Sequence, residues 1–116
     1  MILEPVVQGA GGMRFYSPGY LVQLRALCDA FDVLLIFDEI VTGFRFTYGG
    51  AQDYYGVVPD VCTLGKIIGG GFALAAIAGR ASIMAHFDKA KVGADGFLMQ
   101  LGTLSGAPVS AVAGLK

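Results

Sequence analysis

Continuous apolar runs alternate with amphipathic segments along this chain. The runs ILEPVV (residues 2–7) and VLLIFDEI (residues 33–40) lack the alternation of a strand with one wet face, so we expect two strands covered on both sides. Between them, Ser17 and Pro18 form a helix start signal in which Ser17 is the cap. The apolar stripe expected on this helix consists of Tyr20, Leu21, Leu24, Leu27 and Cys28. Strand, helix and strand in this order predict a βαβ unit, and hence an α/β fold with a mostly parallel sheet flanked by helices.

The second half of the chain continues the alternation. The sequence predicts a short helix near AQDYYG, strands near VCTL and ALAAIAG, and a helix near ASIMAHF. Residues 88–101 are rich in glycine and polar side chains, which predicts a loop, and Pro108 should start a last helix.

The composition is unusually apolar for a chain of 116 residues. Hydrophobic residues make up 55 % and the mean hydropathy is +0.66, which indicates surfaces that meet other protein. The longest apolar run, FALAAIA at 72–78, is far shorter than the roughly 20 residues of a membrane-spanning helix. We therefore expect no membrane span, and we expect residues 1–116 to be part of one domain of a longer polypeptide.

Charge and cysteine content limit the partners and the compartment. With 8 Lys and Arg against 9 Asp and Glu, the net charge of −1 leaves no basic surface for nucleic acid. Cys28 and Cys62 lack metal-site or redox spacing, so we expect buried, reduced thiols and a cytoplasmic protein. His86 is the single histidine, and we expect no metal site.

Candidate chemistry gathers where two predicted strands end. Ligands of open α/β sheets bind at the carboxyl ends of the strands, where Asp38 and Glu39 end one strand and Lys66 follows another. A nucleotide-binding phosphate loop is not supported, because Asp60 and Ile67 replace its first glycine and its hydroxyl residue. A dinucleotide fingerprint also fails, since GAGGMR ends in arginine.

A lone amine and a lone carboxylate in an apolar site suit a different cofactor. A lysine that forms a Schiff base must be partly neutral, and we expect burial beside Leu64 and Ile67 to favour this state in Lys66. Glycines at 65 and 69–71 let the backbone approach a flat ligand. Pyridoxal phosphate is such a ligand, and it needs a carboxylate such as Asp38 at its ring nitrogen. A surface lysine in a turn and an aspartate that caps a loop are the alternatives.

Four segments in order carry a family resemblance: EPVVQGAGG, LLIFDEIVTGFR, YGGAQDYYGVVPDVCTLGKIIGGG and GTLSG. Together they resemble the class III (subgroup II) aminotransferases of the fold-type I pyridoxal-phosphate enzymes. The sequence from GFR onward is similar to the glutamate-1-semialdehyde 2,1-aminomutase branch of the family, whereas EPVVQGAGGMRFY is similar to the diaminopelargonate and β-amino-acid transaminase branches. The resemblance implies a partial cofactor-binding large domain, transfer of an amino group between small molecules, and a homodimer.

The resemblance also assigns site residues. It makes Lys66 the Schiff-base lysine, Asp38 the partner of the pyridine nitrogen, and Ile40 the branched side chain that packs on one ring face. It makes Thr103, in GTLSG, a donor to the cofactor phosphate of the other subunit. An ordinary core isoleucine and a threonine in a turn are the alternatives for the last two. For the whole chain the alternatives are a nucleotide-binding α/β module that uses the DE strand and an inactive piece.

Overall fold

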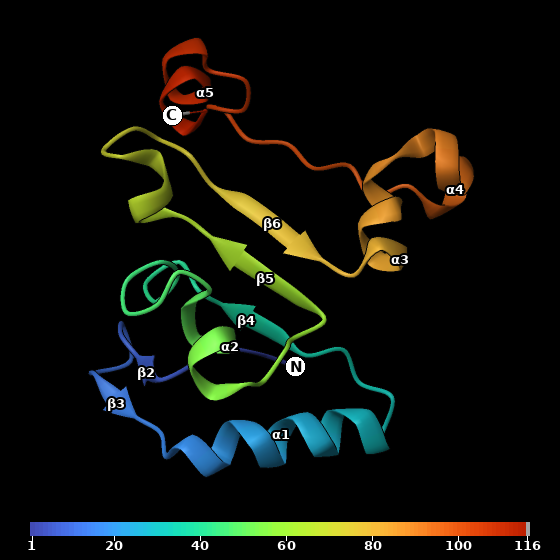
Figure 1. Cartoon of the computed structure of the whole chain (residues 1–116). Coiled ribbons are helices and arrows are strands. Elements are labelled where there is room, and N and C mark those ends of the chain that lie inside the picture. Colours follow the sequence, from blue (N-terminus) through green and yellow to red (C-terminus); the bar gives the residue numbers. More distant parts are fainter. Residues whose placement is uncertain (116) are drawn as a thin grey trace.

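A four-stranded sheet organises the computed structural model, which describes residues 1–115 (Figure 1). The strands lie in the order β1 (Ile2–Leu3), β4 (Ile36–Asp38), β5 (Val61–Leu64) and β6 (Ala76–Gly79). The first three run parallel to one another, and β6 runs antiparallel to β5. The predicted α/β fold with a mostly parallel sheet is confirmed.

The first predicted strand is interrupted. Only β1 joins the sheet, while β2 (Val7–Gln8) pairs with β3 (Arg14–Phe15) in a separate antiparallel hairpin. Pro5 has no N–H for a ladder, and the next residue, Val6, has φ 71°, so the chain turns here. The expectation of one strand over residues 2–7 was therefore wrong.

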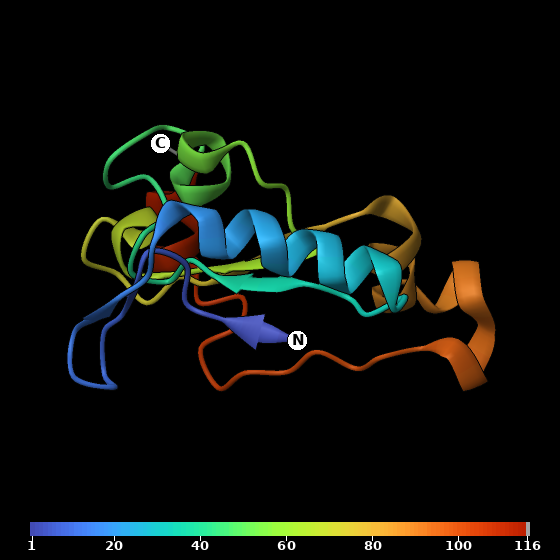
Figure 2. The ribbon, with the colours of Figure 1, turned by 90° about the horizontal axis from the view of Figure 1, so that it is seen from below.

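Helix α1 (Pro18–Ala30) begins at the predicted residue and covers one side of the sheet (Figure 2). Ser17 occupies the cap position, although its side chain makes no capping hydrogen bond. Leu21, Leu24 and Cys28 face the core. Tyr20 and Leu27 lie on one flank of this face, about 40° and 60° around the helix from Leu24, and are exposed, so the predicted stripe was too wide.

The remaining helices follow the sequence except at one place. Helix α2 (Gly50–Tyr55), the helical segment α3 (Ala81–Met84) with η2 (Ala85–Phe87), and α5 (Pro108–Gly114) lie where the pattern predicted them. Helix α4 (Lys89–Gly96), which is interrupted by a kink at Gly93 (φ 74°), replaces part of the expected loop at 88–101. Asp88 starts it by accepting a hydrogen bond from the N–H of Ala90 at 3.0 Å, a capping signal that the glycine content obscured.

The core lies between α1 and the sheet. Phe37 and Leu35 are fully buried there, and the other members of the buried cluster are Leu21, Leu24, Cys28, Val57 and Cys62. Both thiols are free and buried, as expected. Within residues 1–115, no helix is long and apolar enough to cross a membrane.

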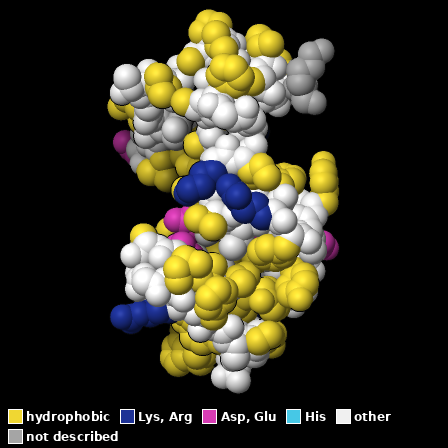
Figure 3. All heavy atoms as spheres, turned by 90° about the vertical axis from the view of Figure 1, so that its left-hand side faces the viewer, with side chains coloured by type: hydrophobic (Ala, Val, Ile, Leu, Met, Phe, Trp, Pro, Cys, Tyr) yellow, Lys and Arg dark blue, Asp and Glu magenta, His cyan; other side chains and the backbone are white. Residues whose placement is uncertain are grey.

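The edge of the sheet at β6 carries no comparable cover within the described chain. All four residues of β6 are exposed, and large hydrophobic side chains such as Leu101 and Phe72 are also exposed. Figure 3 shows hydrophobic side chains spread over one face of the molecule. This agrees with surfaces that meet other protein.

A buried carboxylate, Asp60, joins four elements at the start of β5. It is 6 % exposed and accepts hydrogen bonds from the N–H of Leu35 at 2.6 Å and from Nη1 of Arg25 at 3.0 Å. Nε of Arg80, just after β6, lies 3.2 Å from its other oxygen. Burial by itself would raise the pKa of Asp60, but the N–H of Leu35 and the Arg25 guanidinium hold it below its ordinary value.

We predict that Asp60→Asn lowers the free energy of unfolding by about 1.5–3 kcal/mol at pH 7, because charge-assisted bonds to a buried carboxylate are lost. The folded-state pKa of Asp60 is depressed, so its stabilisation is complete above about pH 4 and disappears as the pH falls further. The difference between wild type and variant should therefore shrink in acid. Urea unfolding of the full-length protein at several pH values measures it. Asp29→Asn removes the exposed partner of Arg25 and serves as the control, with a loss below about 1 kcal/mol.

Candidate active site

The carboxyl ends of β4 and β5 lie side by side. Asp38, the last residue of β4, is in register with Thr63 of β5, and the N–H of Glu39 continues the ladder with a 3.0 Å bond to the carbonyl of Thr63. Lys66 begins the short helix η1 (Lys66–Gly69) two residues after β5 ends. Parallel pairing thus brings the predicted carboxylate and the predicted amine to the same edge of the sheet.

The half-buried carboxylate of Asp38 is held by two donors. Oδ1 accepts one hydrogen bond from the N–H of Ile40 at 3.1 Å and another from Oγ1 of Thr63 at 3.2 Å. Within residues 1–115, the hydrogen bonds of this carboxylate all end on Oδ1. Oδ2 is therefore the oxygen that can accept from a ligand.

Lys66 has an unusual backbone and an open side chain. Its φ of 48° is a left-handed conformation that residues other than glycine rarely adopt, and such strain is concentrated at functional sites. The side chain is exposed, and the neighbouring Ile67 is 43 % exposed. The expected burial of Lys66 was therefore wrong for this chain, because no element within residues 1–115 covers η1 on that side.

Ile40 lies against the backbone that leads into Lys66. A Cβ built on Gly65 would stand 3.4 Å from Cγ2 of Ile40, so the branched side chain and the bare glycine are in contact. Ile40 is half-buried and lies outside the core cluster. The arrangement offers a stiff apolar surface next to the amine.

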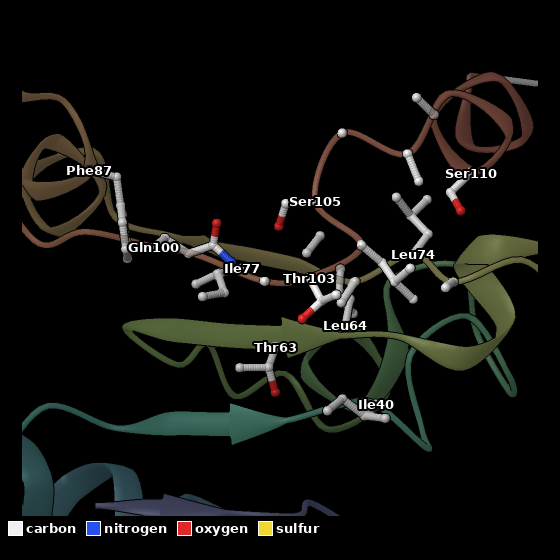
Figure 4. A pocket seen from close by; sticks show the side chains of 18 of the residues that line it. Ile40, Thr63, Leu64, Leu74, Ile77, Phe87, Gln100, Thr103, Ser105 and Ser110 are labelled. Atoms are coloured by element: carbon white, nitrogen blue, oxygen red, sulfur yellow. The ribbon is translucent and has the colours of Figure 1, made fainter.

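A cavity of about 1060 Å³ opens between the sheet and the segment that precedes α5 (Figure 4). Ile40 and Thr63 line it from the strand ends, and Thr103 lines it from the facing segment. Thr103 is exposed. Asp38 and Lys66 are not among the lining residues, but Asp38 is hydrogen-bonded to Thr63 and Lys66 follows the glycine under Ile40. The structure thus brings Ile40, Thr63 and Thr103 to one cavity, whereas Asp38 and Lys66 lie outside its lining.

Glu39 has a different task from its neighbour Asp38. It is 1 % exposed and accepts hydrogen bonds from the N–H of Ala51 at 2.7 Å and from Oγ1 of Thr42 at 3.2 Å. A Cβ at Gly50, which has φ 68°, would overlap Oε2 of Glu39. Glu39 therefore anchors the loop after β4 to α2.

Thr63 is the one residue of this constellation that the sequence analysis missed. The sequence could have indicated it. If the two parallel strands end at the same level, Thr63, three residues before Lys66, lies beside Asp38. A primary amine, a carboxylate with one free oxygen, an apolar face and a backbone without a Cβ can together receive a flat, polar ring.

Comparison with known proteins agrees with this geometry. The family model described as aminotransferase class-III matches residues 1–116. Among curated proteins, the glutamate-1-semialdehyde 2,1-aminomutases of Methanocaldococcus jannaschii and Methanosarcina acetivorans are 48 % and 49 % identical over 115 residues. The match covers 99 % of this chain and 26 % of each relative.

Solved structures give the same result. An omega-transaminase from Sphaerobacter thermophilus superposes with a TM-score of 0.83 at 38 % identity, over 98 % of this chain and 25 % of that one. A β-phenylalanine aminotransferase from Variovorax paradoxus gives 0.84 at 37 % identity, over 97 % and 25 %. A transaminase with PLP bound gives 0.82 at 33 %, over 98 % and 26 %. The chain spans about a quarter of the length of these relatives, and it belongs to the class III aminotransferase family.

Proposed function

We propose that the protein carrying this chain transfers amino groups with pyridoxal phosphate held by Lys66, and that residues 1–116 are part of its cofactor-binding large domain. The observation that carries the proposal is the position of Lys66 two residues after β5, next to the strand end where, within residues 1–115, the hydrogen bonds of Asp38 leave Oδ2 unused. A structural relative at 33 % identity is named as a transaminase with PLP bound, which supports the choice of cofactor.

The residues present fit this cofactor. Asp38 can accept the ring N–H at Oδ2, and Ile40 offers an apolar surface for one ring face. The Gly65 backbone leaves room beside it, and Lys66 supplies the amine. When bound, pyridoxal phosphate acts as an electron sink that stabilises a carbanion next to the transferred nitrogen.

The chain's own residues then divide the work. Nζ of Lys66 would hold the cofactor, and in its unbonded form it would move a proton to and from the substrate carbon as a general base. Asp38 keeps the ring nitrogen protonated through a charge-assisted hydrogen bond. Ile40 fixes the tilt of the ring by packing. The exposed side of Lys66 requires cover from the rest of the polypeptide, because proton transfer of this kind benefits from exclusion of water.

The substrates we propose are small-molecule amino donors and acceptors. The curated relatives at 48–49 % identity are named glutamate-1-semialdehyde 2,1-aminomutase, which favours return of the amino group to a neighbouring carbon of the same substrate. Transfer to a second substrate is the other candidate, since the structural relatives are transaminases. We also propose a homodimer and a cytoplasmic location; the free, buried Cys28 and Cys62 suit a reducing compartment.

We expect borohydride reduction of the full-length holoenzyme to fix the cofactor on Lys66, because this is the amine at the strand end. Peptide mass spectrometry identifies the labelled residue. Lys89 and Lys91 lie on α4, away from that edge, and serve as internal controls that should stay unlabelled. A label on either of them, and none on Lys66, would remove the proposal.

Asp38→Asn should leave the fold and cofactor attachment intact but slow turnover by orders of magnitude, because the ring nitrogen loses the charge that keeps it protonated. Single-turnover kinetics with an amino donor measure the effect. Asp53→Asn, an exposed carboxylate of α2, is the matched control and should turn over at the wild-type rate. Unchanged turnover in Asp38→Asn contradicts the assigned role.

Thr103 tests the proposed dimer. If its hydroxyl binds the phosphate in the other subunit, Thr103→Val should weaken cofactor retention about ten- to a hundredfold, as expected for loss of a charge-assisted hydrogen bond. In a mixed dimer of a Thr103→Val subunit and a Lys66→Ala subunit, only the Thr103→Val subunit keeps Lys66. The phosphate of the cofactor bound to that Lys66 would contact the intact Thr103 of the other subunit. That site should retain cofactor almost normally, as measured by borohydride fixation. Retention as poor as in the Thr103→Val homodimer would mean that the contact forms within one chain, across the cavity that Thr103 lines here.

A further inference from the structure

We infer that Thr63 is a positioning residue for Asp38: its hydroxyl fixes the carboxylate so that Oδ2 alone faces the cofactor ring. This inference rests on the proposed function, because it names a further residue of the same site. Neither the family model nor the names of the relatives assign any role to Thr63.

The geometry that carries the inference joins two strands. Thr63 and Asp38 are register partners in the parallel pair β4 and β5, and Oγ1 of Thr63 lies 3.2 Å from Oδ1 of Asp38. Register partners of a parallel pair point to the same face of the sheet. Thr63 also lines the cavity, together with Ile40 and Thr103 (Figure 4). Its hydroxyl therefore lies between the sheet and the space that a ligand can enter.

The second donor to Oδ1 cannot do this alone. The N–H of Ile40 is only two residues from Asp38, so this bond closes a local turn. If the end of β4 shifts, donor and acceptor shift together, and the bond does not fix the carboxylate relative to the sheet. The torsion that turns a carboxylate about its last bond is broad, and one donor leaves it loosely set. Thr63 is β-branched, has a restricted first torsion, and lies within the hydrogen-bonded ladder. A donor on a separate, rigid strand removes the remaining freedom.

A neutral hydroxyl also suits the electrostatics of the task. It donates to the carboxylate without neutralising it, so the negative charge of Asp38 stays available to a protonated ring nitrogen. A lysine or arginine at position 63 would compete for that charge. Valine has nearly the same shape as threonine and lacks the donor, which makes Thr63→Val a specific test.

The experiment compares Thr63→Val, Thr63→Ser, Asp38→Asn and the double variant Thr63→Val/Asp38→Asn in the full-length protein. The rate of single-turnover proton transfer should fall about tenfold or more in Thr63→Val, the effect of losing one hydrogen bond to a charged group. Thr63→Ser keeps the donor and should stay close to wild type. In the Asp38→Asn background, Thr63→Val should have little further effect, because residues that act through one another are not additive.

Two readouts do not depend on turnover. The dissociation constant of pyridoxal phosphate, measured by titration of the apoenzyme, should rise in Thr63→Val by no more than it does in Asp38→Asn, where the covalent link to Lys66 can still form, and it should not rise in Thr63→Ser. The pH at which the visible absorption band of the bound cofactor changes should move toward the value of Asp38→Asn. A merely structural threonine would alter stability in urea without moving that pH.

Three results would overturn the inference. One is wild-type behaviour of Thr63→Val in rate, cofactor affinity and spectrum. Another is an equal effect of Thr63→Val with and without Asp38. The third applies if Thr63→Val does not fold, in which case Thr63→Ala and Thr63→Ser are compared. An equal loss of proton-transfer rate in these two variants would overturn the inference, because only serine keeps the hydroxyl. Failure of the proposed function can be told apart from failure of this inference, because it is measured on the wild-type protein. If borohydride leaves no cofactor label on Lys66 of the wild type, the proposed function itself is wrong.

Discussion

The parallel pairing of β4 with β5 is the constraint on which the rest of the site depends. It sets Asp38 level with Thr63, and it delivers the chain to Lys66 two residues after the strand ends. A slip of one residue would turn Asp38 toward the core and its apolar neighbour Phe37 away from it. Because Phe37 is fully buried in the core cluster, such a slip would expose a large aromatic side chain. The hydrophobic core thus fixes the register of β4 and β5, and this register determines which polar side chains lie together at the strand ends.

The two ends of this strand pair carry different kinds of polar contact. At the start of β5, Asp60 is saturated by backbone and arginine donors, and this joins α1, β4, β5 and β6. At the far end, Glu39 is also saturated, but in the described part of the chain Oδ2 of Asp38 accepts no hydrogen bond. The two neighbouring carboxylates at the end of β4 therefore differ in their contacts because they face opposite sides: Glu39 holds the loop to α2, whereas Asp38 remains open to a ligand.

The sequence predicted the parts of the fold that depend on strong local signals. Pro18 and Pro108 set helix starts, and the apolar runs around Phe37 and Cys62 set the central strands. It failed where tertiary context decides. The apolar neighbours of Lys66 suggested a burial that needs surrounding chain. The helix after Asp88 was missed for a local reason, since glycines at 93 and 96 obscured the cap, although Gly93 does interrupt that helix.

The candidate site was predictable in its residues more than in its contacts. Lys66 and Asp38 follow from strand-end reasoning together with the family resemblance, and the structure brings both to one edge of the sheet. Thr63 escaped notice because a threonine within a strand is ordinary until its register partner is known. Thr103 lines a cavity opposite Ile40 and Thr63, a placement that depends on tertiary contacts and not on a local sequence signal.

The backbone of Lys66 has a consequence for the balance between stability and function. A lysine held at φ 48° costs of the order of 1 kcal/mol relative to a residue that tolerates this conformation. Glycine adopts it without a steric penalty. Selection for folding alone would therefore favour a glycine next to Gly65, at the cost of the Lys66 amine that follows β5. The backbone at Lys66 is thus kept in a locally unfavourable conformation, so exchange of this residue for glycine is a change that stability alone would not oppose.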